Sequence, residues 1–194
     1  MTSTTTSTTA GLRVYPGLLC NSIEFFNGPH GKFKVMSAGK VKEFKDAPYS
    51  HHLILDEAIQ KEPETFKILN EWYPHSELKR RIQFGSCRFG GLDFTPDVTD
   101  FQLQEGEYSE CEARDYCPGA GILCHAPRYK NEEISFFEVK ILKLLATHDT
   151  NEYIAYQLNM PLGSFHLAKK NLYQKLGIQT KPEAALISRD LNLI

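Results

Sequence analysis

The sequence predicts two unlike parts: an α+β N-terminal domain with a cysteine-rich irregular segment, followed by an all-α domain of four short helices. Two observations lead to this division. Apolar residues recur at helical spacing, with few glycines, from residue 134 onward. Residues 85–127, in contrast, hold four of the five cysteines and show little periodicity. We therefore expect a disordered tail at residues 1–10, an N-terminal domain at 11–130 and a helical domain at 131–194.

Composition and charge narrow the class of protein. The chain of 194 residues is long enough to bury a core, and its charged fraction of 24% is ordinary for a globular protein. No run of 18 apolar residues is present, so we expect no membrane span. The start, MTSTTTSTTA, lacks the basic and apolar regions of a secretory signal, so we expect a cytoplasmic protein. Because the net charge is −2, any nucleic-acid site must be a local patch.

The N-terminal domain is expected to contain a short strand and three helices. Residues 31–39 alternate in hydrophobicity between turn-forming residues, which is typical of a strand. Residues 53–73 have helical spacing interrupted at Pro63, and a proline is tolerated in the first turn of a helix. We therefore predict two helices there, and a third at 76–84 with Ser76 as its N-cap.

Other groups in this half form no recognisable catalytic site. The adjacent His51 and His52 are expected on the surface or in the core. Arg80 and Arg81 are expected to be solvated on the third helix. The glycine-rich residues 90–94 lack the helix and the lysine of a phosphate-binding loop. We therefore do not expect an enzyme.

The irregular segment contains a candidate metal site. Clustered cysteines in a reducing compartment indicate metal or redox chemistry more often than structural disulfides. The candidate ligands are Cys87, Cys111, Cys117 and Cys124. Four thiolates suffice for a tetrahedral Zn²⁺ or, alternatively, for an iron–sulfur cluster. Because the spacing is wider than a C-x2-C knuckle, ordinary thiols are a third interpretation, and the isolated Cys20 is expected to lie outside the site.

The C-terminal residues predict a series of short amphipathic helices. Ser135 and Glu138 form a capping-box pattern at the start of a helix over residues 134–146. A second helix opens at Thr150 or Asn151, because both residue types cap helix N-termini. Each of these helices has an apolar face suited to packing against its neighbours.

A tight turn is expected between the second and third helices, at residues 159–163. Pro161 and Gly163 act there as helix breakers. The third helix is then expected over residues 164–176, and a fourth begins at Pro182. Two helices joined by such a turn form a helix-turn-helix layout.

The third helix has one apolar face and one polar face. The apolar residues, expected to be buried, are Phe165, Ala168, Leu172 and Leu176. The polar residues on the opposite face and its flanks are Ser164, His166, Lys169, Lys170, Asn171, Gln174 and Lys175. Lys181 adds a positive charge beside the fourth helix. Side chains of these types contact bases and phosphates of duplex DNA, so we expect them to form a DNA-binding surface.

Residues 134–194 resemble the LuxR/GerE-type helix-turn-helix domain of bacterial transcriptional regulators. The family's first helix ends in Leu-Leu-Ala, which is matched at residues 144–146. Its Asn-Glu-x-Ile-Ala pattern is matched at 151–155, and its Asn-Ile/Leu-Tyr-x-Lys-Leu-Gly run at 171–177. A late basic-x-Glu-Ala pattern is matched at 181–184. The resemblance implies a DNA-binding domain whose fourth helix commonly pairs two copies.

Several positions depart from the family pattern. Pro161 replaces the usual serine at the start of the turn, and Ser164–Phe165 replaces a Thr-Val pair. His166 stands where the family usually has lysine, and Leu167–Ala168 stands where Thr and His follow. Because these positions affect contact with the groove, the departures concern the DNA sequence that is read and the strength of binding.

The resemblance predicts a transcriptional regulator that binds duplex DNA as a homodimer. The N-terminal domain would then act as a sensor or as a platform for a protein partner. An alternative is a metal-stapled interaction module whose helix-turn-helix has lost sequence-specific DNA binding. The seven basic and seven acidic side chains of residues 131–194 keep this alternative open. A redox or metal-dependent enzyme built on the cysteines is a third hypothesis.

Overall fold

The structure is a computed structural model that describes residues 14–194, and the disordered tail expected at residues 1–10 lies outside this range. The helices are α1 (Tyr49–Lys61), α2 (Pro63–Trp72), α3 (Glu77–Arg88), α4 (Phe136–Leu145), α5 (Asn151–Gln157), α6 (Leu162–Leu176) and α7 (Lys181–Asp190). The strands are β1 (Glu24–Asn27), β2 (Phe33–Ser37), β3 (Lys40–Glu43), β4 (Val98–Thr99), β5 (Gln102–Leu103), β6 (Arg128–Tyr129) and β7 (Glu132–Glu133). Short 3-10 helices are η1 (Pro29–Gly31), η2 (Phe44–Asp46) and η3 (Arg114–Tyr116).

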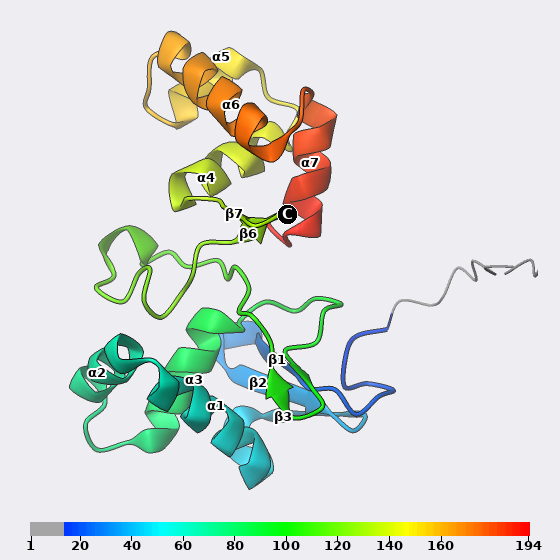
Figure 1. Ribbon diagram of the computed structural model, residues 1–194, viewed down its shortest axis with the longest axis vertical. Coiled ribbons are helices and arrows are strands. Elements are labelled where there is room, and N and C mark those ends of the chain that lie inside the picture. The colour runs from blue at the N-terminus through cyan, green and yellow to red at the C-terminus, as the bar shows by residue number, and fades with distance from the viewer. Residues whose placement is uncertain (1–13) are drawn as a thin grey trace, which may run out of the picture.

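The expected fold class, an α+β domain followed by an all-α domain, is wrong. Helices occur along the whole described chain and the strands lie between residues 24 and 133, so the protein is a mixed α and β structure (Figure 1). The physical reason is that the helices after residue 135 do not complete their core alone. Tyr108 and Tyr129 pack against that core, and the Arg114 guanidinium lies 4.4 Å from the centre of the Phe136 ring.

The largest sheet is a three-stranded antiparallel meander in the order β1-β2-β3. Glu24 pairs with Met36, and Ser37 pairs with Lys40 across a turn in which Ala38 and Gly39 have positive φ. The strand expected at residues 31–39 is therefore confirmed in part, as β2. The sequence did not reveal β1 or β3, because each has four residues and β3 has no buried face that would produce an alternating pattern.

Aromatic side chains form the centre of the N-terminal core. The Phe25 ring of β1 lies 5.8 Å from both the Phe33 ring of β2 and the Phe44 ring of η2. Helix α3 crosses this sheet at Gly85, where an added Cβ would come within 2.2 Å of the Phe33 ring. Glycine is therefore needed at this position for the helix to approach the sheet.

Helix α3 extends beyond its expected end at residue 84. The Ser76 hydroxyl accepts a hydrogen bond from Lys79 N at 3.3 Å, which confirms the predicted N-cap. The helix then continues through Gly85 to Arg88, because packing against the sheet outweighs the low helix propensity of glycine. Cys87 therefore lies in the last turn of a helix rather than in an irregular segment.

The expectation that Arg81 is solvated is wrong. Its side chain is buried, and it joins α3 to α1. The Nε atom donates to Asp56 Oδ1 at 2.7 Å, and the Nη2 atom donates to Glu77 Oε2 at 2.9 Å. The guanidinium of Arg81 is thus paired with acids of the N-terminal half and is not available to a ligand.

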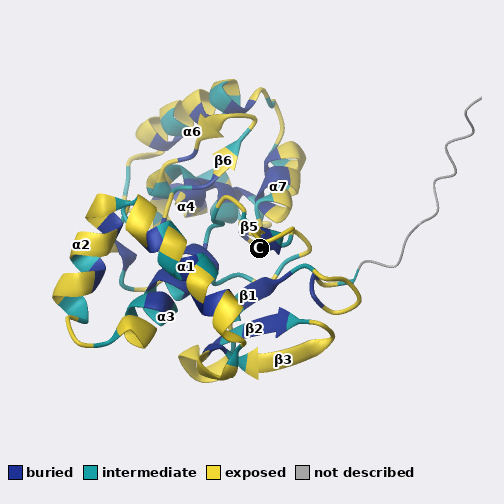
Figure 2. Cartoon of the chain, turned by 60° about the horizontal axis from the view of Figure 1, so that its bottom comes forward, coloured by how far each residue is buried: buried dark blue, intermediate teal, exposed yellow. Residues whose placement is uncertain are grey.

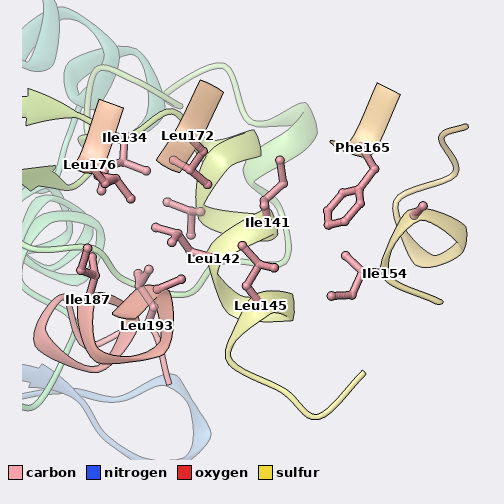
Figure 3. Packing of buried hydrophobic residues seen from close by; sticks show 13 residues of the cluster. Ile134, Ile141, Leu142, Leu145, Ile154, Phe165, Leu172, Leu176, Ile187 and Leu193 are labelled. Carbon is pink, nitrogen blue, oxygen red and sulfur yellow. The ribbon is translucent and has the colours of Figure 1, made fainter. Parts of the chain in front are cut away.

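Helices α4 to α7 surround a second core. Its buried side chains are Ile134, Val139, Ile141, Leu142, Leu145, Ile154, Ala155, Phe165, Leu172, Leu176, Ala184, Ile187 and Leu193. Figure 3 shows Phe165 of α6 facing Ile154 of α5, with Leu145 of α4 next to them. Helix α7 closes against α4, where the Ser188 hydroxyl donates to Leu142 O at 3.1 Å.

The stretch between the two cores, residues 128–133, forms a short hairpin, in which β6 pairs with β7 and the turn residues Lys130 and Asn131 have positive φ. The domain boundary placed at residue 130 stays a prediction. Across residues 14–194, no helix combines the length and the apolar character that crossing a bilayer requires.

Candidate functional site

The predicted helix-turn-helix corresponds to α5, a turn at residues 158–161, and α6. Helix α5 begins at an N-cap, where the Thr150 hydroxyl accepts a hydrogen bond from Tyr153 N. It ends in a Schellman motif, because Asn159 has a φ of 51° and Met160 N donates to Ala155 O at 3.0 Å. This local geometry sets the direction in which the chain enters α6.

Helix α6 begins two residues before its expected start. Pro161 is the N-cap, and its carbonyl accepts a hydrogen bond from Phe165 N at 3.0 Å. Gly163 therefore lies in the first turn of the helix and does not break it. Glycine destabilises a helix mainly in its interior, so it is tolerated in the first turn at small cost. At the other end, Gly177 adopts the left-handed conformation of a C-terminal cap.

The two faces of α6 are arranged as predicted. Phe165, Leu172 and Leu176 are buried, and Ala168 is half-buried. The exposed polar side chains are Ser164, His166, Lys170, Asn171 and Gln174. Figure 2 shows the outer surface of α6 largely exposed, which leaves this polar face accessible.

Three of the candidate lysines have partners within the protein. Lys169 Nζ donates to Asn151 Oδ1 at 3.2 Å and lies 5.6 Å from the centre of the Tyr173 ring. Lys175 pairs with Glu138 Oε2 at 2.8 Å, and Lys181 Nζ donates to Asp149 O at 2.5 Å. These contacts stabilise the packing of α4, α5 and α6, and they reduce the positive charge that this surface presents.

Glu138 shows how firmly Lys175 is held. Burial acts to raise the pKa of Glu138, but hydrogen bonds from Lys175 and Ser135 lower it below its ordinary value. Lys170 differs from Lys175, because its ammonium has no hydrogen bond or ion pair with any residue from 14 to 194. Lys170 is thus the α6 lysine whose charge is free for a ligand.

Exposed apolar side chains also surround α6, and sequence analysis missed them. Leu167 is 60% exposed on α6, while Tyr153 and Tyr156 are 50% and 74% exposed on α5. The two tyrosine rings lie 6.2 Å apart. The signal in the sequence was the presence of aromatic residues at positions of α5 that the apolar stripe does not use.

The four candidate cysteines come from three places in the fold. Cys87 is half-buried in the last turn of α3 and accepts a hydrogen bond from Gln83 Nε2 at 3.2 Å. Cys111 and Cys117 flank η3, and Cys124 is buried at the end of the segment. Their thiols are free.

The structure brings these four cysteines into one region. The pKa of the Cys87 thiol is raised to about 11, first by burial and then by its electrostatic interaction with Cys124, Cys111 and Cys117. Among residues 14–194, however, no three His, Cys, Asp or Glu side chains lie close enough together to hold a metal ion as they stand. The thiols are therefore gathered without being at ligand spacing.

A group of carboxyl side chains was also missed by sequence analysis. Asp93, Asp97 and Glu107 line a cavity of 710 Å³ that lies beside α1 and the end of α3. Burial raises the pKa of Glu107 to about 8 and that of the adjacent Glu24 to about 8. Glu24 lies far from the other three acids in sequence, and only the folded chain places it beside them.

No protein-family model, curated protein or solved structure matches the chain. The resemblance to the LuxR/GerE-type domain thus depends on the quoted motifs and stays a prediction. The positions that carry it lie at the end of α4, in α5, in the second half of α6 and at the start of α7.

Proposed function

We propose that the protein is a transcriptional regulator that binds duplex DNA by inserting α6 into the major groove. The observation that carries this proposal is the exposed polar face of α6, on a helix whose opposite face is anchored by Phe165, Leu172 and Leu176. A rigidly held helix that presents amide, hydroxyl and ammonium groups is suited to reading base edges.

The spacing of the exposed polar residues supports insertion of α6 along its length. His166, Lys170 and Gln174 are four residues apart and therefore form one row on the helix surface. Asn171 lies next to this row, and an asparagine amide can form a bidentate contact with adenine. Lys170 is suited to a phosphate contact because its charge has no internal partner.

Selection from a pool of random duplexes, followed by fluorescence anisotropy at several salt concentrations, tests the proposal. We expect Lys170→Ala to weaken binding similarly on all sequences and to reduce the salt slope by about one. Asn171→Ala or Gln174→Ala should instead change the preferred bases, at a cost of about 1–3 kcal/mol on the selected site.

Lys67→Ala is the matched control for the loss of one positive charge. Lys67 is an exposed residue of α2, at the end of the molecule away from α6 (Figure 1). This variant should bind DNA as the unaltered protein does. Binding that does not depend on salt, or Lys170→Ala binding with an unchanged slope, contradicts the placement of α6 in the groove.

We extend the proposal to a homodimer formed through α7. Leu186 of this helix is 50% exposed, while the adjacent Ile187 is buried. A two-fold pair of α7 helices would cover Leu186 and present two copies of α6 to a palindromic site. Sedimentation velocity should show Leu186→Glu as a monomer, whereas Leu53→Glu on α1 should stay dimeric. A monomer mass for the unaltered protein at all concentrations, with and without DNA, contradicts the dimer.

A second candidate function is an interaction module that has lost sequence-specific DNA binding. The observation in its favour is the apolar surface of Leu167, Tyr153 and Tyr156 next to α6. The partner would then be a protein with a complementary apolar face. Leu167→Ser should abolish that binding while leaving any DNA binding intact.

A further inference from the structure

The cavity beside α1 is not used by the proposed contact with DNA. Its volume of 710 Å³ lies within the range of about 300–1,000 Å³ that is typical of small-molecule sites. Part of its lining is apolar. Ile54 and Ala58 of α1 contribute to it, and so do Phe101 and Leu103 of the β4–β5 hairpin. The cavity therefore has both the room and the apolar surface to hold the body of a small ligand.

Carboxyl groups lie at the base of the same hairpin and also line the cavity. Asp97 directly precedes β4, and Glu107 follows β5. Asp97 Oδ2 accepts a hydrogen bond from Phe25 N at 2.6 Å, and Glu107 Oε1 accepts one from Gly91 N at 2.5 Å. These backbone bonds fix both carboxyls, while Asp97 Oδ1 has no hydrogen-bond partner within residues 14–194.

Glu24 of β1 adds a further carboxyl to this group. Its side chain is fully buried, and its Oε1 atom accepts a hydrogen bond from Asp93 N, on the loop that lines the cavity, at 3.0 Å. Its Oε2 atom is buried without a hydrogen-bond partner in the described chain. A buried carboxyl with an unsatisfied oxygen is costly unless a proton or a cation accompanies it.

The folded chain supplies no cation to these acids. No basic side chain of residues 14–194 forms an ion pair with any of them. Arg88 also lines the cavity, but its guanidinium is occupied: it donates to Leu123 O at 2.9 Å and to Ile122 O at 2.8 Å, and it pairs with Glu62 at 2.9 Å. The lining holds seven acidic and three basic side chains, so the ionised cavity attracts positive charge.

We propose that this cavity binds a small organic cation whose ammonium group contacts Asp97 and Glu107 and whose aromatic body packs against Ile54 and Phe101. A primary ammonium has three donors and no acceptor, which suits a group of carboxyl oxygens. A metal ion is not the expected occupant, because no three such side chains of the described chain are at ligand spacing. The inference does not depend on DNA binding by α6.

Binding of the cation should release a proton to solvent. The pKa of Glu107 is raised to about 8, first by burial and then by Asp93, which shares a hydrogen bond with it. The other charged groups around Glu107 are Glu24 of β1, Asp97, and Arg88 of α3. Because an ammonium favours the ionised carboxylate, the affinity should rise as the pH increases through about 8.

Isothermal titration calorimetry of the full chain with tryptamine tests the site. Tryptophol and indolepropionate are matched controls, because they carry a hydroxyl or a carboxylate in place of the ammonium. At about pH 9 the acids are ionised and the amine is still protonated. We expect tryptamine to bind about tenfold more tightly than tryptophol, and indolepropionate not to bind. Equal affinities for the three compounds, or no binding of tryptamine at millimolar concentration, would overturn the proposal.

Substitutions that keep the backbone hydrogen bonds test the carboxyls. Asp97→Asn and Glu107→Gln each remove a negative charge but retain an oxygen that accepts from the same N–H group, so we expect both variants to fold. Each should weaken tryptamine binding about tenfold, and Glu107→Gln should also flatten the rise of affinity with pH. Glu64→Gln, at an exposed position of α2, should bind as the unaltered protein does. Unchanged affinity in both cavity variants would contradict the site.

Chemical shifts locate the ligand without any substitution. In the unaltered protein, tryptamine should shift the amide signals of Phe25 and Gly91, whose N–H groups donate to the two carboxyls. The amides of α6 should not shift. Shifts confined to another surface would place the amine elsewhere and overturn the proposal, even where a variant fails to fold.

Discussion

At the residue scale, Arg88 does the most to position the cysteine-rich segment. Besides its bonds to two loop carbonyls, it forms a bidentate pair with Glu62 at 2.9 and 3.0 Å. Burial acts to raise the pKa of Glu62, but hydrogen bonds from Arg88 and Thr65 lower it below its ordinary value. One side chain thus connects α3, the start of α2 and residues 122–123.

Arg88→Met should lower the free energy of unfolding by about 3 kcal/mol, because it leaves the loop carbonyls and Glu62 without their donor. Urea unfolding measures the change. Arg189→Met is the matched control, since Arg189 pairs with Asp190 on the surface, and it should cost less than about 0.5 kcal/mol. Equal effects of the two substitutions would contradict a structural role for Arg88.

The buried carboxyls are a second feature at this scale. Glu24 is fully buried, its Oε1 atom accepts a hydrogen bond from Asp93 N at 3.0 Å, and its Oε2 atom lacks a partner among the described residues. Burial raises the pKa of Asp97 well above its ordinary value, and the charge of Glu24 raises it further. The folded protein therefore favours the protonated acids.

The raised pKa of Glu24 predicts lower stability at alkaline pH. Above the ordinary pKa of 4.5 the unfolded chain releases this proton, whereas the folded chain keeps it. The contribution of Glu24 to the free energy of unfolding is therefore fully present below pH 4.5. It is lost as the pH rises through the folded pKa of about 8. Thermal melts should show a smaller alkaline loss for Glu24→Gln, whereas the exposed Glu64→Gln on α2 should behave as the unaltered protein does.

At the element scale, the turn before α6 determines where the polar face points. Asn159 takes the left-handed conformation that ends α5, and few residues other than glycine and asparagine adopt it easily. The apolar contacts of Phe165 then fix the rotation of α6 about its axis. A change at Asn159 should therefore affect both stability and DNA binding.

Asn159→Ala should destabilise the protein by about 1 kcal/mol, because the Cβ of alanine is sterically strained at positive φ. Asn159→Gly should be tolerated, since glycine adopts this conformation freely. Thermal unfolding measures both variants. Equal stability of the two would show that the turn adopts another conformation in solution.

At the scale of the whole molecule, the cysteine-rich segment joins the two cores. The Arg114 guanidinium lies between the Tyr108 ring, at 4.6 Å, and the Phe136 ring, at 4.4 Å. It also donates to Ser109 O. Ion pairs from Lys140 and Lys143 of α4 to acids of the same segment surround this contact on the surface.

Arg114→Gln should weaken the coupling between the cores by about 1–3 kcal/mol through the loss of two cation–π contacts. The fluorescence of Trp72, the single tryptophan, reports on the N-terminal half, and far-ultraviolet circular dichroism reports on all helices. The two unfolding curves should coincide for the unaltered protein and separate for Arg114→Gln. Lys140→Ala, which breaks an exposed pair with Asp115, should leave them coincident.

Local signals made several elements predictable. Ser76 and Ser135 cap α3 and α4 as expected, because a hydroxyl before an amphipathic run satisfies the first free N–H groups. Such signals could not show that the chain does not divide into an α+β part and an all-α part, since this depends on which side chains complete the second core. The carboxyls around Glu24 could not be foreseen either, because they are close in space and distant in sequence.

The sequence by itself determined the helices of residues 134–194, the polar face of α6 and the four cysteines, because periodicity, capping and residue type are local properties. The tertiary structure alone decided which lysines have a partner. Lys175 pairs with Glu138, a residue 37 positions earlier, while Lys170 has no partner among the described residues. It also decided that Cys87 lies on a helix beside the loop of Cys124. The physical reason is that pairing and burial depend on contacts between distant segments, which no local pattern records.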